Sequence, residues 1–309
     1  MASRSRAHRR VPIAAIAVVA GFLGACEAYN RDWYRSLVDG STTPDVVQAP
    51  DGIDAGDATI DVPIVETFDP FDATDSPAPV DAPPPADNPI PPSDSGLDNT
   101  SCDDTHAGAL FCDGFEEPAL PDWNAFVSPS ASRAATGAYR GAGALRAETT
   151  SSGGSSVAAA NVFAHLTTGD LYLRGYYYFP SGYDIHGMYV LMAISTSGQN
   201  TGMGVVAGGR VNSYTMPGMH YLSGASSITF ARDRWVCLEM HIALSTTATG
   251  SIDLSVDGAM AASETGFTTA PTEGYTNLYV GIPYAEPTQG PAIVYVDEVV
   301  ADTNPIGCD

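Results

Sequence analysis

Between Cys102 and Cys308 the chain alternates apolar and polar residues in short runs, and no helical period extends over about ten residues. The run Trp235–Leu244 places apolar side chains at every second position: Val236, Leu238, Met240, Ile242 and Leu244. The run Leu171–Phe179 alternates in the same way. Because successive side chains of a strand point to opposite faces, each run predicts a strand with one apolar face directed into a core.

Alternation together with β-branched and aromatic content predicts eleven strands. They are Ala109–Phe115, Gly143–Glu148, Ser156–Ala164, Leu171–Phe179, Met188–Ser195, Met203–Ala207, Ser227–Phe230, Trp235–Leu244, Ser251–Val256, Tyr275–Ile282 and Ala292–Ala301. The pair Asp257-Gly258 predicts a tight hairpin turn, since both residues tolerate a positive φ. Residues 101–309 are therefore expected to form an all-β domain, a two-sheet antiparallel β-sandwich of jelly-roll type.

The N-terminus has the pattern of an export signal. Four arginines stand within residues 1–10, and the uncharged apolar stretch 11–25 follows. That stretch is short for a membrane-spanning helix and suits a signal peptide. It ends in Leu-Gly-Ala-Cys26, which resembles the bacterial lipobox. We expect residues 1–25 to be a lipoprotein signal peptide and acyl chains on Cys26 to hold the protein in a lipid bilayer.

Two alternatives to lipidation stay open, namely an ordinary secretory signal with an incidental Cys26 and an uncleaved transmembrane helix. Glu27 follows Cys26 in place of the aspartate that marks inner-membrane retention, which favours the outer membrane. The expected localisation is therefore export, with anchoring to the cell envelope.

Residues 26–100 have the composition of a disordered linker. Pro, Asp, Ala, Ser and Thr dominate, and residues 27–100 hold sixteen acids and two arginines, a net charge of −14. Such a segment buries too little apolar surface to offset its chain entropy. Proline and charge repulsion keep it extended, so it is expected to hold the domain away from the membrane.

The charge balance narrows the class of partner. The full chain has a formal net charge of −23 and contains no lysine. Such a surface repels phosphate backbones and argues against a nucleic-acid partner. It is compatible with calcium, neutral sugars and cationic partners.

Four cysteines remain after Cys26, namely Cys102, Cys112, Cys237 and Cys308. An even number in an exported domain predicts two disulfides, with three possible connectivities. We favour Cys102–Cys112 as a local link and Cys237–Cys308 as a long-range link. A zinc site of four thiolates is the alternative, which the absence of a C-x-x-C pair disfavours.

The domain resembles the concanavalin A-like lectin/glucanase family. The residues that carry the resemblance are FCDGFE at 111–116, GAYRGAGALRAE, LYLRGYYYFPSG, RDRWVCLEMHI, GSIDLSVDG and the closing VYVDEVVADTNPIGC. The resemblance covers about residues 109–308 and implies the two-sheet fold. It does not decide function, because this fold hosts binding modules and enzymes alike.

Catalytic motifs of the family are not found in the sequence. The E-x-D-x-x-E strand of laminarinase-type hydrolases, which places paired carboxylates on one face, is absent. The R-x-E-L-R and Q-I-H strands of alginate-lyase type are absent too. The first interpretation is therefore a non-catalytic module that binds a carbohydrate or a matrix polymer.

The candidate ligand site lies on the polar faces of two predicted strands. Arg174, Tyr176 and Tyr178 share one face of the first, and Glu239 and His241 share one face of the second. If the protein is an enzyme, Arg174, Tyr176, Glu239 and His241 would form a lyase-like set, with arginine neutralising a uronate and histidine or tyrosine moving a proton. An ordinary polar sheet face with an ion pair explains the same residues.

Further tyrosines, Tyr183, Tyr189, Tyr214 and Tyr221 among them, suggest stacking on sugar rings or plain packing. Asp113, Glu116 and Asp297 lie on the first and last strands, where sandwiches resembling this one often hold structural calcium. An acidic edge that discourages strand addition is the other explanation of these three carboxylates.

Two alternatives to the binding module remain. One is a polysaccharide-degrading enzyme of the same fold, a lyase or a glycoside hydrolase. The other is a structural or adhesive surface protein that binds no sugar.

Overall fold

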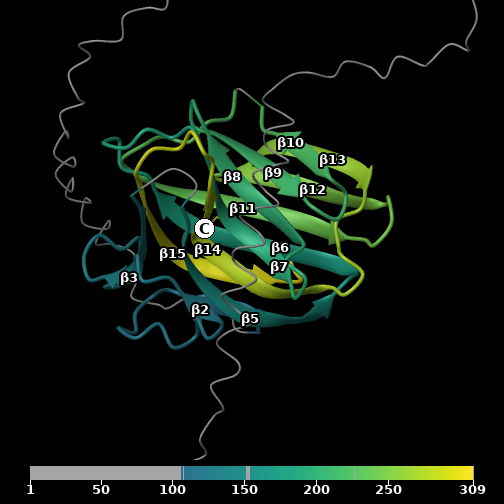
Figure 1. The fold of residues 1–309 in the computed structure, drawn as a ribbon, viewed down its shortest axis with the longest axis horizontal. Coiled ribbons are helices and arrows are strands. Elements are labelled where there is room, and N and C mark those ends of the chain that lie inside the picture. The colour runs from purple at the N-terminus through teal and green to yellow at the C-terminus, as the bar shows by residue number, and fades with distance from the viewer. Residues whose placement is uncertain (1–105, 107, 151–153, 226, 309) are drawn as a thin grey trace, which may run out of the picture. The chain divides into compact units, whose positions relative to one another are not determined.

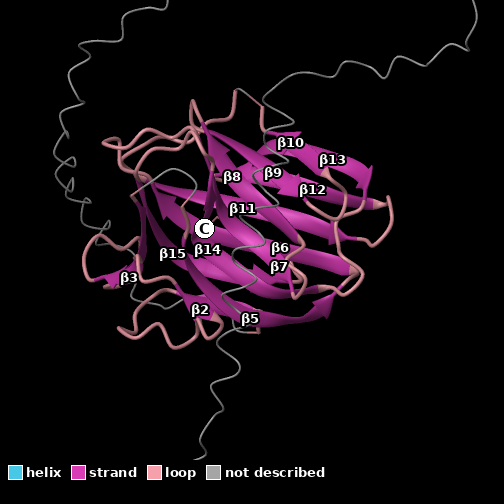
Figure 2. Cartoon of the chain, viewed as in Figure 1, coloured by secondary structure: helices cyan, strands magenta, loops and turns pink. Residues whose placement is uncertain are grey.

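The computed structural model describes residues 106, 108–150, 154–225 and 227–308, all within the compact unit Pro85–Asp309. This part of the chain consists of strands and loops and contains no helix (Figure 2). Accordingly, it offers no helix that is long and apolar enough to cross a membrane. The predicted signal peptide, Cys26 and the linker all fall outside the described residues.

The strands form two antiparallel sheets, which overlie each other in Figure 1. Sheet A has the order β13-β12-β11-β6-β15-β4-β3, and β1 also pairs with β15. Its strands are β1 (Phe111–Asp113), β3 (Ala131–Ala134), β4 (Ala144–Thr149), β6 (Gly169–Tyr178), β11 (Trp235–Leu244), β12 (Gly250–Val256), β13 (Ala259–Phe267) and β15 (Ala292–Asp302).

Sheet B has the order β10-β9-β8-β7-β14-β5-β2. Its strands are β2 (Phe126–Val127), β5 (Ser156–Leu166), β7 (Gly187–Ser195), β8 (Asn200–Val206), β9 (Arg210–Thr215), β10 (His220–Ser223) and β14 (Tyr275–Ala285). The all-β, two-sheet antiparallel sandwich expected from the sequence is thereby confirmed.

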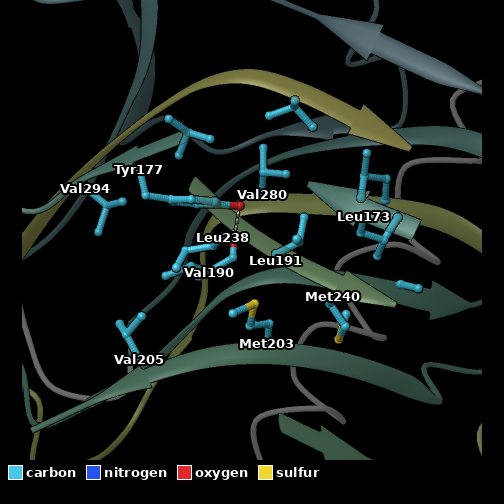
Figure 3. Packing of buried hydrophobic residues seen from close by; sticks show 14 of the residues in the cluster. Leu173, Tyr177, Val190, Leu191, Met203, Val205, Leu238, Met240, Val280 and Val294 are labelled. Atoms are coloured by element: carbon cyan, nitrogen blue, oxygen red, sulfur yellow. Dashed lines mark hydrogen bonds between the residues drawn. The ribbon is translucent and has the colours of Figure 1, made fainter. Parts of the chain in front are cut away.

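The core lies between the two sheets, as the alternation predicts. Strand β11 has the predicted bounds, and Val236, Leu238, Met240 and Ile242 are fully buried in the core cluster. Figure 3 shows Leu238 and Met240 of sheet A among Val190, Leu191 and Met203 of sheet B. At about 25 cal/mol per Å² of buried apolar area, this contact between the sheets is the main favourable contribution to folding.

One buried hydroxyl joins the sheets through a hydrogen bond. The Tyr177 hydroxyl of β6 donates to the Val190 carbonyl oxygen of β7 at 3.2 Å (Figure 3). Burial raises the pKa of Tyr177, so this hydroxyl stays protonated and remains a donor.

The Asp257-Gly258 turn is confirmed as the link between β12 and β13. Both residues have positive φ, 48° and 75°, as a tight hairpin requires. The Asp257 carboxylate also accepts a hydrogen bond from the Cys237 N–H at 2.9 Å, which ties the turn to β11.

Several predicted strand bounds need correction. Residues 227–230 form no strand, and the strands β2, β3, β9, β10 and β13 were not predicted. Strand β8 begins at Asn200, three residues before the predicted start. Strand β2 has only two residues, too few to show an alternation, and in β9 two of the inward positions are the hydroxyl residues Ser213 and Thr215.

The long-range disulfide is confirmed. The Cys237 and Cys308 sulfurs are bonded, with their Cα atoms 5.8 Å apart across 71 residues of sequence. Cys112 is also disulfide-bonded. Its predicted partner, Cys102, lies outside the described residues.

Candidate functional site

The five predicted ligand residues meet on the outer face of sheet A. Strands β6 and β11 are direct neighbours, with Glu239 opposite Arg174 and Cys237 opposite Tyr176. Sequence alternation therefore placed these side chains on one face correctly. It gave no information about what lies over that face.

The C-terminal segment after β15 covers part of this face. The Gly307 N–H donates to Glu239 Oε2 at 2.8 Å, and Arg174 Nη1 donates to the Gly307 carbonyl oxygen at 3.2 Å. The neighbouring Cys308 is bonded to Cys237. Arg174 is only 2% exposed, and desolvation by this burial lowers its pKa.

A loop before β4 covers the other part of the face. The Tyr139 ring stacks on the Tyr176 ring, with the centroids 3.8 Å apart. Tyr178 is buried and meets Trp235 and Tyr295 edge to face. Burial raises the pKa of both Tyr176 and Tyr178. These two rings are thus packed by the protein itself.

His241 is held by two carboxylates. Its Nδ1 lies 2.9 Å from Asp253 Oδ2, and its Nε2 lies 2.8 Å from Asp170 Oδ1. Tyr172 stacks on the imidazole, with centroids 4.2 Å apart. Both ring nitrogens of His241 are thus engaged by side chains of the protein itself. A ligand role for the five predicted residues stays a prediction.

The predicted calcium ligands do not form a cluster of side chains. Among the described residues we find no group of three or more metal-binding side chains. Asp113 instead accepts hydrogen bonds from the Phe115 N–H and the Trp123 indole. Asp297 and Glu116 both accept from the loop at residues 139–142, Asp297 from two backbone N–H groups and Glu116 from the Ala142 N–H.

Two buried carboxylates nevertheless meet at this loop. Asp297 is fully buried and Glu298 is 2% exposed, and desolvation raises the pKa of both. Glu298 Oε2 has no hydrogen-bond partner among the described residues. Any metal ion here would need backbone carbonyl oxygens besides these side chains.

Acidic residues are distributed unequally between the two sheets. Every acidic residue within a strand belongs to sheet A, and the seven strands of sheet B contain none. The sheet A acids are Asp113, Glu148, Asp170, Glu239, Asp253, Glu264, Asp297, Glu298 and Asp302. Residues 101–309 together hold twenty acids and seven arginines, a net charge of −13, so an acid-free sheet is unexpected here.

The outer face of sheet B presents uncharged polar and aromatic side chains instead. One cross-strand row runs through Ser223, Asn212, Gly204, Tyr189 and Tyr284. Tyr189 and Tyr284 lie with ring centroids 6.3 Å apart. Strand β9 adds the single arginine of these strands, Arg210, to the same face.

A hydrogen bond joins Asn212 of β9 to Tyr221 of β10. Asn212 Nδ2 donates to the Tyr221 hydroxyl oxygen at 2.8 Å. The neighbouring Gly204 has no side chain, and a Cβ there would lie 2.3 Å from Asn212 Oδ1. Asn212 is 3% exposed and its Oδ1 has no hydrogen-bond partner in the described structure. Tyr221, by contrast, is 42% exposed.

The outer face of sheet B therefore carries Arg210, Asn212 and Tyr221, one cation and two hydrogen-bonding groups, of which Asn212 and Tyr221 are in contact. Sequence reasoning considered Tyr221 for sugar stacking but missed Arg210 and Asn212. The alternation R-V-N-S-Y, beginning at Arg210, was the available signal, since every second residue is polar and large.

No protein-family model matches this sequence, and no curated protein sequence matches it. Solved structures share its fold. Endo-beta-1,4-glucuronan lyase from the fungus Trichoderma reesei has a TM-score of 0.51 at 16% identity, over 63% of this chain and 96% of the lyase. The PL-14 alginate lyase from Aplysia kurodai has a TM-score of 0.48 at 11% identity, over 63% and 99% of the two chains. At 16% identity, the similarity to the glucuronan lyase establishes a shared β-sandwich fold.

Proposed function

We propose that this domain binds an acidic polysaccharide on the outer face of sheet B and cleaves it by β-elimination. The observation that carries the proposal is the acid-free sheet, with Arg210, Asn212 and Tyr221 on its outer face. A polyanion would be repelled by sheet A, whose strands hold nine acids, two of them buried, against three arginines. The strands of sheet B carry no acidic residue that would repel a polyanion, and they carry one cation, Arg210.

The residues match what elimination from a uronic acid needs. The reaction breaks the C5–H and C4–O bonds, forms a C4=C5 double bond, and transfers a proton to the leaving oxygen. Arg210 lies two residues before Asn212, about 7 Å along the strand, and supplies positive charge for the uronate carboxylate. The Tyr221 hydroxyl, which accepts a hydrogen bond from Asn212, takes the proton from C5 and gives its own proton to the leaving oxygen.

The comparison with known structures favours the same substrate class. The most similar fold reported above belongs to a lyase that acts on glucuronan, a polymer of uronic acid. The sequence lacks the strand motifs of alginate-lyase type, so its elimination would use a different set of side chains.

Incubation with acidic polymers tests the proposal. The purified chain is mixed with glucuronan, with alginate and with a neutral cellulose oligomer, and the absorbance of unsaturated uronate is followed. We expect a rise with at least one acidic polymer and none with the neutral one. If a polymer retards the protein in a gel but no unsaturated uronate is formed, the protein is the non-catalytic binding module. If neither retardation nor absorbance is observed, both activities are excluded.

We also propose that calcium binds beside the loop at residues 139–142. The support is the pair of buried carboxylates, Asp297 and Glu298, with one oxygen unpaired in the described structure. Calcium would offset the free-energy cost of burying the two carboxylates. It is therefore expected to raise the melting temperature by several degrees relative to the protein in a buffer that contains a chelator. An Asp297→Asn variant should lose the shift, and equal melting of the natural protein in both buffers would contradict the proposal.

Anchoring through Cys26 is a separate proposal. It rests on the apolar stretch 11–25 and the Leu-Gly-Ala-Cys26 pattern. A Cys26→Ala variant loses the acceptor thiol, and we expect the protein to move from the membrane pellet to the soluble exported fraction. Immunoblots of the two fractions measure this, and retention of the variant in the pellet would show that acylation is not the anchor.

A further inference from the structure

A second registered row crosses all seven strands of sheet B. The printed strand pairs connect consecutive members of this row without a gap. In strand order from β2 to β10, the row is Phe126, Ala159, Tyr279, Met192, Gly202, Tyr214 and Tyr221. Its ends are aromatic, and two of its inner positions carry only a methyl group or a hydrogen.

The β2 end of this row points away from the core. Val127 packs against the core cluster, whereas its neighbour Phe126 is not part of that cluster. The same contrast holds on β14, where Leu278 and Val280 belong to the core and Tyr279 does not. Phe126 and Tyr279 are both half-buried, so part of each ring reaches the outer face.

A short side chain separates these two rings. Ala159 of β5 pairs with Phe126 on one side and with Tyr279 on the other. Neighbouring strands are about 4.8 Å apart, so the rings stand on backbones about 10 Å apart with only a methyl group between them. Two rings at this separation can contact a single flat sugar ring, whose C–H groups suit an aromatic surface.

The distance to the proposed reaction site is also informative. From β2 to β10 there are six strand spacings, which is about 29 Å. A distance of this length accommodates several consecutive sugar rings of an extended polysaccharide. A polymer held at Tyr221 and lying along the row would therefore reach Phe126 as well.

We propose that Phe126 and Tyr279 form a remote sugar-binding subsite, filled by a polysaccharide that crosses the strands of sheet B. The inference rests on the proposed function at Arg210, Asn212 and Tyr221 and adds a binding contact remote from the chemistry. The subsite serves long chains only. It contributes to KM, and kcat depends on the residues at the other end of the row.

The test compares a long and a short substrate in a Phe126→Ala variant. With glucuronan, loss of the ring is expected to raise KM about tenfold while kcat stays within a factor of two. With a glucuronan trisaccharide, which is too short to span the sheet, KM should not change. Phe126→Tyr keeps the ring and should restore the natural KM. Met260→Ala, at a 56% exposed methionine on β13 of sheet A, is the matched surface control.

The outcomes separate the two proposals. If the natural protein cleaves glucuronan and Phe126→Ala has an unchanged KM, the subsite is refuted and the proposed function stands. An equal rise of KM for polymer and trisaccharide refutes the subsite too, because the effect is then not confined to long chains. If the natural protein neither cleaves nor binds glucuronan or alginate, the proposed function fails and the subsite fails with it.

Discussion

A Tyr221→Phe substitution is expected to lower kcat/KM for the elimination reaction by about 10²- to 10³-fold, within the range known for loss of a general acid or base. The change removes only the hydroxyl that accepts the Asn212 amide hydrogen bond at 2.8 Å. The ring remains, so packing and sugar stacking are preserved. Initial rates of unsaturated-uronate absorbance with glucuronan measure the loss.

A matched control comes from the opposite face. Tyr172→Phe on sheet A also removes one tyrosine hydroxyl and keeps the ring that stacks on His241. It should leave the rate unchanged. Because Asn212 and Tyr221 act as a unit, Asn212→Ala should cost about as much as Tyr221→Phe, and the double variant little more. A Tyr221→Phe enzyme with the natural rate would remove Tyr221 from the mechanism.

Loss of the Cys237–Cys308 disulfide is expected to lower the free energy of unfolding by about 4 kcal/mol, because the bond closes a long loop in the unfolded chain. The bond spans 71 residues. The Gly307 hydrogen bonds to Glu239 and Arg174 depend on the same tail and should weaken with it. Urea unfolding of a Cys237→Ser/Cys308→Ser double variant measures the change.

A second variant separates the bond from the tail. Deletion of residues 303–309 together with Cys237→Ser removes both, so any additional loss belongs to Ile306 and the Gly307 contacts. Elimination activity should persist in each folded variant, since the tail lies on sheet A and the proposed site on sheet B. A loss of stability below about 1 kcal/mol in the double variant would contradict the loop-closure argument.

The buried framework was predictable because its signal is local. A core strand such as β11 repeats one pattern over ten residues, and Val236 to Ile242 follow it in the folded protein. The Asp257-Gly258 turn follows from residue type alone and depends little on distant context. The Cys237–Cys308 pairing was the favoured one of three possible connectivities, and only the fold brings these two residues together across 71 residues.

The strands of the proposed site gave a weaker signal. In β9 the inward positions are Val211, Ser213 and Thr215, and two of the three are hydroxyl residues. Buried hydroxyls are tolerated here because Thr215 hydrogen-bonds to Thr201 at 2.5 Å and Ser213 contacts Met240 Sδ. Hydrophobic alternation therefore does not mark β9, and Arg210 and Asn212 were overlooked with it.

The sequence by itself determined the all-β class, the alternating faces of the long strands and the set of residues on each face. Only the tertiary structure decided which face other segments cover, because Tyr139 and Gly307 reach the outer face of sheet A from far along the chain. The separation of acids between the sheets was likewise a result of strand order. Alternation has a range of a few residues, whereas strand order and covering segments depend on contacts across the whole domain.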